Sequence, residues 1–593
     1  MFPKRFITDF AECRPCVPTT AWPGRRTAIL ACVADSITLL PTPGGCAVQA
    51  VGGSRMLPWQ VAAAMLDDAH LDVWTLAPGE LSPWDGERLL AGLAAAAPAA
   101  LAILTGPWPP QRETVQSLPR CERRWRRTID LGVLVGDPDA ACCRAGLALP
   151  GDDPLRLVTT LAGLAAHQQR ELLVRERLLA AHPWIGDAAW LATTGLLAEL
   201  VVLQGLRRHQ VKQDVAPDTM PVTRLLRDPG RFIARRSDVA AAMRSILDGT
   251  VSWNERGHLA LRPAAGWQLT VGGVSLTCGV GGLHSTDPPG VVAGPLTDLD
   301  VASYYPSLIA RDGIAPPQLQ DFPARVGALL QRRLAAKRAG DQVASTALKL
   351  VINSLYGQLG NRRSGLFSPA DALRVVLTGQ LRLLQLIDGV LDAGGHLVSA
   401  NTDGVVVRGS CEAAAAAWEA TTGLSLERTR YGRLWRTSVN DYIAMSPDGT
   451  VAKTKGRFAG GDDVDASRRA AAPIVARAAL EHLVHGRTLA DVVAASESPA
   501  DFALWRRARD LAWGGRAVTS PVVRWVVGRS GEPLVQLAEG RGRSTVAAKA
   551  IPLSDPATCD LTLIDRAWYV AEAQALVDRV LGTEQGTQQL SLL

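Results

Sequence analysis

Two helical segments separated by a two-residue break place the strongest constraint on how this chain can fold. Helical periodicity covers residues 324–339 and resumes over 342–358, with only Gly340 and Asp341 between them. A connection this short brings the second helix back alongside the first. The sequence therefore predicts an antiparallel helical hairpin in this part of the chain.

Basic and polar residues share one face of each predicted helix. Arg333 and Lys337 are four residues apart, and Lys349, Asn353 and Tyr356 stand at positions i, i+4 and i+7 of the second helix. Two such faces turned toward the same space would form a cationic grip for a triphosphate. For either helix alone, the alternative is an ordinary solvated basic face.

Two aspartates stand at predicted strand ends on either side of the hairpin. Asp300 ends a strand-like run, and Asp403 lies in a β-hairpin signal after a further helix expected at 370–391, where two apolar runs join through Asp403-Gly404. Each aspartate alone is a common turn residue. At the tips of adjacent strands, however, they would supply the hard oxygen ligands that metal-assisted phosphoryl transfer needs.

The length of 593 residues allows three to five domains. Residues 1 to about 200 alternate strand-like and helical stretches, which is typical of an α/β domain. The strand-like runs include 28–33 and 131–135, and the helical stretches include 155–179 and 188–206. Dense Gly and Pro around 272–294 indicate a domain junction, and residues from about 462 are expected to be mainly helical with some strand.

Composition permits nucleic acid as a partner but does not demand it, since the net charge is only +6. The most apolar uncharged stretch, 89–105, is interrupted by Pro98 and is shorter than the roughly 20 residues of a membrane-spanning helix. The ten cysteines are scattered, and the CxxC pair Cys13 and Cys16 has no second pair in metal-ligand register. We therefore expect a cytoplasmic protein with no membrane contact and no zinc.

Four segments, in order, resemble the motifs of family B DNA polymerases. DVASYYPS at 300–307 resembles DxxSLYPS, and KLVINSLYG at 349–357 matches KxxxNSxYG at every defined position. ANTDGV at 400–405 resembles GDTDSV, and KTKGRF at 453–458 resembles the lysine-rich primer-contact motif. The resemblance is strong over about 295–460 and is closest to compact phage- or plasmid-type members.

The resemblance implies an α+β multidomain protein with the right-hand polymerase fold and an N-terminal α/β exonuclease-like domain. The implied parts are an exonuclease-like remnant at 1–200, a connecting region at 201–290, a palm at 291–323 and 361–460, fingers at 324–360 and a thumb at 461–593. The implied activity is template-directed addition of dNTPs to a primer 3′ end, with primer–template DNA as the partner.

The resemblance also implies roles for individual residues. Asp300, Asp403 and the backbone of Val301 would hold two Mg²⁺ ions, for which Mn²⁺ can substitute, and Tyr305 would be the steric gate that excludes a 2′-hydroxyl. The incoming nucleotide would meet Ser303, Tyr304, Tyr305, Arg333, Lys337, Lys349, Asn353, Tyr356 and Gly357. The primer–template backbone would meet Lys453, Lys455 and Arg457, in a contact that depends on salt rather than on sequence.

The sequence departs from the family pattern in two places, the third motif and the N-terminal region. The usual first Asp is Asn401 and the usual Ser is Gly404, which leaves the pair Asp300 and Asp403 intact but lowers the local negative charge. In the N-terminal region, Asp35 is followed two positions later by Ile37 instead of Glu. Further aspartates there, Asp137, Asp139 and Asp187, lack the family's surrounding patterns. We therefore expect an exonuclease-like remnant, or alternatively an unrelated domain, and no proofreading.

Spacing and a glycine-rich segment add two further expectations. The interval from Asp300 to Lys349 has no room for the insertion of protein-primed relatives, which favours a nucleic-acid primer. GVGGLHS at 279–285 resembles a template-strand motif, and the alternative is a loop or strand distortion. Two rival functions stay open: a catalytically silent polymerase-like DNA-binding scaffold, and a reverse transcriptase or primase.

Overall fold

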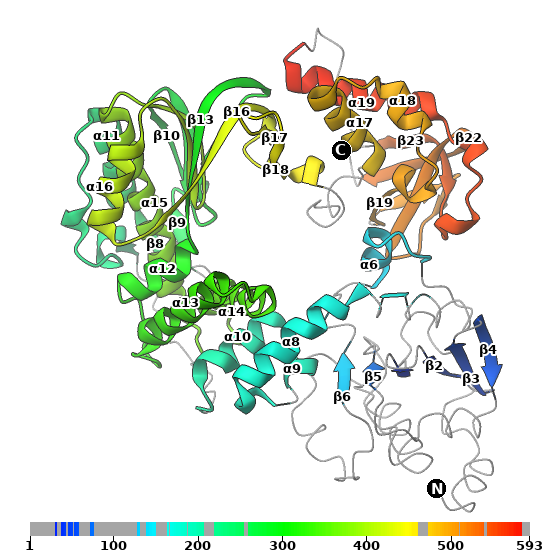
Figure 1. Ribbon diagram of the computed structural model, residues 1–593, viewed down its shortest axis with the longest axis horizontal. Coiled ribbons are helices and arrows are strands. Elements are labelled where there is room, and N and C mark those ends of the chain that lie inside the picture. Colours follow the sequence, from blue (N-terminus) through cyan, green and yellow to red (C-terminus); the bar gives the residue numbers. More distant parts are fainter. Residues whose placement is uncertain are drawn as a thin grey trace, which may run out of the picture.

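Long antiparallel strands flanked by helices form one half of the molecule (Figure 1). The computed structural model describes residues 219–253, 259–459, 472–508, 510–538 and 542–583, parts of 134–206 and short strands between residues 30 and 130. Within these residues the fold is mixed α/β, with several sheets and many helices. None of the described helices is both long and apolar enough to cross a membrane.

The central sheet is antiparallel and has six strands in the order β14-β15-β13-β16-β17-β18. The strands are β13 (Gly290–Val301), β14 (His396–Asn401), β15 (Gly404–Arg408), β16 (Leu426–Ser438), β17 (Asp441–Met445) and β18 (Val451–Lys455). Side chains alternate between the faces of a strand. Leu299 and Val301 accordingly enter the main core, whereas Asp298 and Asp300 point to the other face, which Leu296 shares with Tyr431.

Helices cover the core face of this sheet. They are α12 (Tyr304–Arg311), α15 (Pro369–Asp392) and α16 (Glu412–Thr422). α15 packs against β14 and β15 and is apolar almost all round, with Leu377, Leu381 and Leu384 fully buried. Its bounds lie within two residues of the predicted 370–391, because Pro369 opens the helix and Gly394 follows its end.

The predicted helical hairpin is confirmed as α13 (Phe322–Arg338) and α14 (Gln342–Gly360). Asp341 caps α14 by accepting a hydrogen bond from Ala344 N at 2.9 Å, and Gly340 adopts φ +72°, a turn conformation that favours glycine. The hairpin packs against α8 (Gln169–Ala181) and α10 (Thr194–Leu203). The four helices thus form one helical layer beside the sheet (Figure 1).

Polar contacts tie the N-terminal helices to both ends of the hairpin. Arg325 of α13 donates to the carbonyl oxygens of Val202 and Leu203 at the end of α10, at 2.9 and 3.2 Å. At the turn of the hairpin, Arg177 of α8 forms an ion pair with Asp341. The hairpin is therefore held along its length by helices that lie far away in the sequence.

Two small sheets accompany the central sheet, one beside β14 and the other against α15. One has the order β10-β11-β12, formed by Trp267–Val271, Val274–Gly279 and Gly282–Ser285. The other has the order β7-β8-β9, formed by Met220–Pro221, Thr250–Trp253 and Leu259–Arg262. Helix α11 (Ser237–Leu247) packs against β10 and α15. The domain junction expected around 272–294 is thus ordered strand structure that continues into β13.

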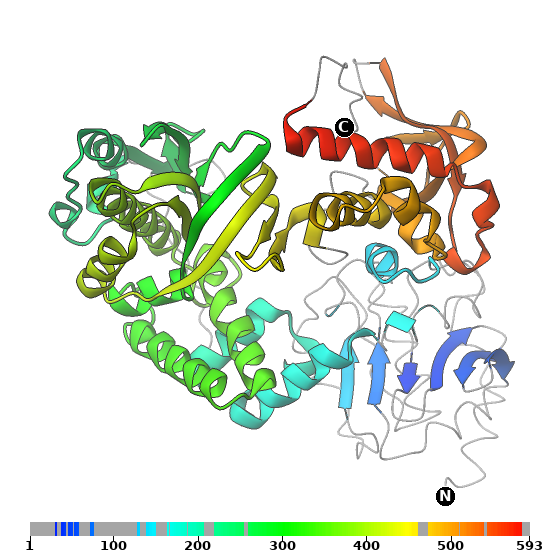
Figure 2. The same ribbon diagram turned by 45° about the horizontal axis from the view of Figure 1, so that its top comes forward.

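The C-terminal part contradicts the expectation of a mainly helical region. Helices α17 (Pro473–His485), α18 (Leu489–Ala494) and α19 (Arg566–Leu581) pack against a five-stranded sheet (Figure 2). Its strands are β19 (Leu504–Arg507), β20 (Leu511–Trp513), β21 (Arg516–Ala517), β22 (Val522–Ala538) and β23 (Gly542–Pro552). The β-branched residues of β22 and β23 account for the strands, and the buried Tyr569 hydroxyl ties α19 to them by accepting from Val527 N at 2.8 Å.

The N-terminal strands form a six-stranded sheet in the order β4-β3-β2-β1-β5-β6, in which only β5 and β6 pair in parallel. In chain order, strands β1 to β6 are Leu30–Cys32, Ile37–Thr42, Gly45–Ala50, Gly53–Leu57, Asp72–Thr75 and Arg127–Asp130. The strand expected at 28–33 is confirmed by β1, whereas the strand near 131–135 ends at Asp130. Asp139 lies in the first turn of α6 (Pro138–Arg144). Outside the described residues lie Cys13, Cys16, Asp35, Asp137 and Asp187.

Candidate active site

The backbone brings Asp300 and Asp403 together at the same end of neighbouring strands in the central sheet. Asp300, next to last in β13, stands in register with Gly404 of β15. Thr402 and Asp403 form the two-residue turn between β14 and β15, and Val301 N donates to the Asp403 carbonyl oxygen at 2.7 Å. The predicted hairpin is therefore present, but its turn lies one residue earlier than expected, and Gly404 opens the next strand.

Burial and neighbouring negative charges make the Asp300 carboxyl group harder to ionise. Burial first, and then repulsion by the Asp403 and Asp298 carboxylates, raises the pKa of Asp300 to about 7. Glu427 adds to the rise, and Lys453 opposes it. A carboxyl group with such a pKa is one that a cation would readily stabilise in the ionised form.

The close packing of β15 against β13 explains why position 404 is glycine, which the sequence alone did not reveal. A side chain at this position would place its Cβ 2.8 Å from the Leu299 carbonyl oxygen and 3.1 Å from Asp300 Cα. The Asp300 carboxylate itself lies 3.2 Å from the same point. The close approach of β13 and β15 therefore requires glycine where related motifs carry Ser.

The donor set fits a cation that is only partly coordinated by protein. Among the described residues, no group of three or more His, Cys, Asp or Glu side chains gathers around a common point. Mg²⁺ is commonly bound by one or two carboxylates, with phosphate and water oxygens completing its octahedral coordination. Asp300 and Asp403, both hard oxygen donors at one strand edge, meet that requirement.

The connection from β13 into α12 is strained and is held by the helical hairpin. Ser303, the N-cap of α12, has φ +50°, a left-handed conformation that is uncommon for a residue with a side chain. Ser307 N donates to the Ser303 carbonyl oxygen at 2.9 Å, and Arg333 of α13 donates to the Ser303 hydroxyl. Arg333 is thus directed at the turn that follows Asp300.

Lys337, one helical turn after Arg333, reaches β16, the strand that pairs with β13. Its Nζ lies 2.9 Å from Glu427 Oε1, and both side chains are more than half exposed. Glu427 belongs to β16 and stands in register opposite Asp300. Arg333 and Lys337 of α13 therefore both contact residues beside the aspartate pair.

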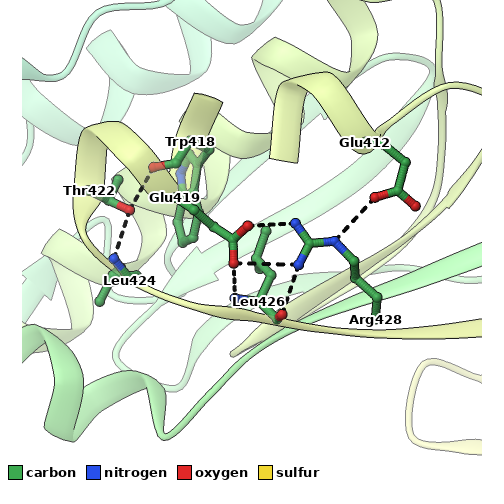
Figure 3. Close-up of polar contacts among 7 residues, drawn as sticks. All are labelled: Glu412, Trp418, Glu419, Thr422, Leu424, Leu426 and Arg428. Atoms are coloured by element: carbon green, nitrogen blue, oxygen red, sulfur yellow. Dashed lines mark hydrogen bonds and ion pairs between the residues drawn. The ribbon is translucent and has the colours of Figure 1, made fainter. Parts of the chain in front are cut away.

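Helix α16 fixes the start of β16 through Leu426 and Arg428 (Figure 3), which flank Glu427 in the sequence. Glu419 accepts from Leu426 N at 2.7 Å and from the Arg428 guanidinium at 2.5 Å, and Glu412 accepts from Arg428 at 3.2 Å. The Arg428 hydrogen bond holds the pKa of Glu419 below its usual range. The residues on both sides of Glu427 are thereby anchored, so the start of β16 is well defined beside Asp300.

Three tyrosines expected near the nucleotide occupy different environments. Tyr304 is 4% exposed and donates to the Gly379 carbonyl oxygen at 2.6 Å, so its side chain belongs to the core and not to the site. Tyr305 is only partly buried, and its ring centroid lies 4.6 Å from that of Tyr356. Burial raises the pKa of both Tyr305 and Tyr356. Tyr305 and Tyr356 therefore form a neutral aromatic pair between α12 and α14.

The exposed face of α14 carries the other residues expected at the triphosphate. Lys349 and Asn353 are exposed, and so is Gly357, where an added Cβ would meet nothing within 4 Å. The opposite face is buried, through Val351, Ile352 and Leu355 among others. This separation leaves the polar face of α14 available for a ligand.

The residues expected to contact DNA lie on and just after β18, the outermost strand of the central sheet, and Lys453 reaches back toward β13. Lys453 of β18 lies 3.3 Å from Asp298 Oδ2, which also accepts from the Tyr431 hydroxyl at 2.6 Å. Arg457 forms an ion pair with Asp441 at 2.7 Å, while Lys455 is half-buried on β18 opposite Tyr442. Sequence reasoning missed Asp298 and Glu427, although Asp298 stands two residues before Asp300 and so shares its face.

Comparison with known proteins adds a weak likeness in fold. No protein-family profile and no curated protein matches this chain. A solved structure of the family B DNA polymerase from the hyperthermophilic archaeon Pyrobaculum calidifontis is similar over 94% of this chain and 78% of that chain. The TM-score is 0.43 and the sequence identity is 13%. The functional argument therefore depends on the residues of the site itself.

Proposed function

We propose that this chain is a template-directed DNA polymerase that adds dNTPs to a primer 3′ end. The observation that carries the proposal is the placement of Asp300 and Asp403 at one sheet edge, next to the two cations Arg333 and Lys337 of α13. Paired carboxylates beside a cationic helix are what metal-assisted transfer from a triphosphate requires. The ordered motifs of the sequence support the same reading.

In this proposal the parts of the chain take the places of a right hand. The central sheet with α12, α15 and α16 is the palm, and α13 with α14 forms the fingers. The C-terminal sheet and helices α17–α19 take the place of the thumb, and the N-terminal sheet is an exonuclease-like domain without proofreading. Because α14 packs against α8 and α10, closure of the fingers over a nucleotide would carry those two helices along.

Asp300, Asp403 and the Val301 backbone would hold Mg²⁺ in this site. The bound ions would lower the pKa of the primer 3′-hydroxyl and offset the charge of the triphosphate and its leaving oxygens. Asp300 has to lose its proton to bind a cation, and its raised pKa makes that loss sensitive to pH near neutrality. Lys453, which opposes that rise, favours the ionised carboxylate.

The nucleotide would lie between α13 and the sheet edge. Arg333 and Lys337, with Lys349 and Asn353 from α14, would bind the triphosphate, exchanging their present contacts with Ser303 and Glu427 for phosphate oxygens. The Tyr305 and Tyr356 rings would border the sugar and the nascent base pair, with Tyr305 excluding a 2′-hydroxyl. Lys453, Lys455 and Arg457 would bind the primer–template backbone.

A catalytically silent DNA-binding scaffold is the alternative, and Asn401 motivates it because it removes one negative charge from the turn. Asn401 has a structural use, however: its Oδ1 accepts from Thr402 N at 2.9 Å and its Nδ2 donates to Asn440 Oδ1 at 3.0 Å. A scaffold also has no need for Lys349 and Asn353 on the exposed face of α14. These residues favour the enzyme.

Primer extension separates the two functions. Purified protein with a primed DNA template, dNTPs and Mg²⁺ or Mn²⁺ is expected to extend the primer, and Asp403→Ala is expected to abolish extension while it retains DNA binding. Absence of extension by the wild type in both metals, with DNA still bound, would establish the scaffold. An RNA template and a reaction without primer, run in parallel, test the reverse transcriptase and primase alternatives, and a labelled primer tests for degradation.

A further inference from the structure

The segment 279–285 contacts the hairpin that carries Asp403. Strand β12 (Gly282–Ser285) lies beside β14, an edge strand of the central sheet. The Ser285 hydroxyl donates to the Ala400 carbonyl oxygen at 3.1 Å and accepts from Ala400 N at 2.9 Å. One buried side chain thus satisfies the backbone groups of β14 that another strand would otherwise pair.

His284, the neighbour of Ser285, continues this contact to the turn itself. Its Nδ1 lies 2.9 Å from Asn401 Oδ1, and its Nε2 lies 3.0 Å from the Gly281 carbonyl oxygen. Since Thr402 N donates to the same Asn401 oxygen, the orientation of the Asn401 amide is defined, and Nδ1 of His284 is the donor. The Asn401 side chain therefore receives two hydrogen bonds and donates a third to Asn440.

This network uses both halves of the Asn401 amide. Its oxygen accepts from His284 and Thr402, and its Nδ2 donates to Asn440 Oδ1. Asn401 joins β12, β14 and the turn between β16 and β17 through these three bonds. It also directly precedes the two-residue turn, so its side chain fixes the Thr402 amide directly before Asp403.

Gly282, at the start of β12, packs against the same turn and against the Tyr305 hydroxyl. It has φ +103°, and an added Cβ would lie 3.0 Å from the Thr402 side chain and 3.2 Å from the Tyr305 hydroxyl. At the end of β11, the Gly279 carbonyl oxygen accepts from Gln380 Nε2 of α15. The end of β11 is thus bonded to α15, and Gly282 at the start of β12 packs closely against Thr402.

We propose that His284 is a positioning residue of the active site, which holds the turn 401–403 so that the Asp403 carboxylate is presented beside Asp300. This role rests on the polymerase function proposed above, and it assigns the segment 279–285 to support of the catalytic hairpin instead of to the template strand. Residues that orient a metal ligand in this way typically change metal affinity or activity by about 10- to 100-fold when they are removed.

The test compares His284→Leu, which removes both ring nitrogens, with His284→Asn, whose amide can donate from a position close to Nδ1. His396→Leu is the matched control, because His396 is exposed at the far end of β14, the strand whose other end His284 contacts. Single-turnover primer extension gives the maximal rate and the dNTP Kd, and EPR of free Mn²⁺ gives metal affinity without any turnover. Thermal unfolding and DNA binding report on the fold.

We expect His284→Leu to lower the maximal rate and the Mn²⁺ affinity about tenfold, with the dNTP Kd changed less than twofold. His284→Asn should recover most of both losses, and His396→Leu should resemble the wild type. The inference is overturned if His284→Leu retains the wild-type maximal rate and Mn²⁺ affinity, if the dNTP Kd rises and the Tm falls along with these losses, or if His284→Asn is no better than His284→Leu. A wild type that binds Mn²⁺ in a His284-dependent manner but extends no primer would refute the polymerase function and leave the positioning role standing.

Discussion

Lys337 of α13 donates to Glu427 of β16 at 2.9 Å, and Glu427 stands in register opposite Asp300. In the proposed enzyme, the triphosphate has to take Lys337 away from this partner. Both side chains are more than half exposed, so the ion pair contributes only about 0–1 kcal/mol and is easily exchanged. The contact is therefore suited to a cation that changes partner when a nucleotide binds.

Substitutions of these two residues should act in opposite directions on nucleotide affinity. Lys337→Met removes a phosphate contact and should raise the dNTP Kd about tenfold, since hydrogen bonds to charged groups contribute about 1.5–3 kcal/mol. Glu427→Gln releases Lys337 and should lower the dNTP Kd about twofold. Single-turnover extension at several dNTP concentrations measures both, with Arg338→Met as the control on the same helix. A rise of Kd in both variants would show that Glu427 does not compete for Lys337.

The raised pKa of Asp300 predicts how pH affects the stability of the metal-free protein. The pKa of Asp300 is about 7 in the folded state and 3.8 in the unfolded chain, so the folded state binds the proton more tightly. The stabilisation of the fold that this proton binding provides is complete below pH 3.8 and is lost as the pH rises through about 7. Asp300→Asn keeps the position neutral. In EDTA, its Tm should exceed that of the wild type at pH 8, and the difference should shrink steadily toward pH 5. A difference that does not change with pH would contradict the assigned cause.

The helical hairpin, α15 and the β14–β15 hairpin could be predicted from the sequence because their signals are local. Periodicity, Gly340-Asp341 and Asp403-Gly404 specify them within a few neighbouring residues, and helix bounds agreed within about two residues. The polar face of α14 was readable for the same reason. Asp300 and Asp403 required the ordered motifs, since neither is distinctive alone.

Contacts between distant segments could not be read in this way. Nothing local in His284 indicates that it meets Asn401, and Glu427 becomes a neighbour of Asp300 only through the pairing of β13 with β16. Tyr304 and Tyr305 look alike in sequence, but the turn at Ser303 sends one into the core. The extent of the C-terminal strands was underestimated, because the pairing of β22 with β23 is interrupted by register shifts.

Arg325 should contribute measurably to the stability of the helical layer. It satisfies two carbonyl groups at the end of α10, Val202 and Leu203, which have no partner within the helix itself. Arg325→Met should lower the free energy of unfolding by about 1–3 kcal/mol, because charged hydrogen bonds to a helix end are lost. Chemical denaturation measures this loss, and the exposed Arg338→Met should change it by less than about 0.5 kcal/mol. Equal effects of the two variants would show that the tie to α10 is not stabilising.

Lys455 should add to DNA affinity in proportion to one phosphate contact. Since each neutralised phosphate contributes about 0.9 to the slope of log K against log salt, Lys455→Ala should reduce that slope by about one. Fluorescence anisotropy with a primed duplex between low and moderate salt gives the slope. Arg457→Met is less informative, because its ion pair with Asp441 links it to the fold. An unchanged slope in Lys455→Ala would remove this residue from the DNA interface.

Gly404 should resist replacement by the Ser that related motifs carry. The added Cβ would meet the Leu299 carbonyl oxygen at 2.8 Å and Asp300 Cα at 3.1 Å, and neither backbone atom can move without separating β13 from β15. Gly404→Ser should therefore cost about 1–3 kcal/mol of stability and displace Asp300, with a matching loss of extension. Gly360→Ser is the control, because a Cβ there meets nothing within 4 Å. If Gly404→Ser unfolds at the wild-type temperature and extends primers normally, the strands are less closely packed at Asp300 than this geometry requires.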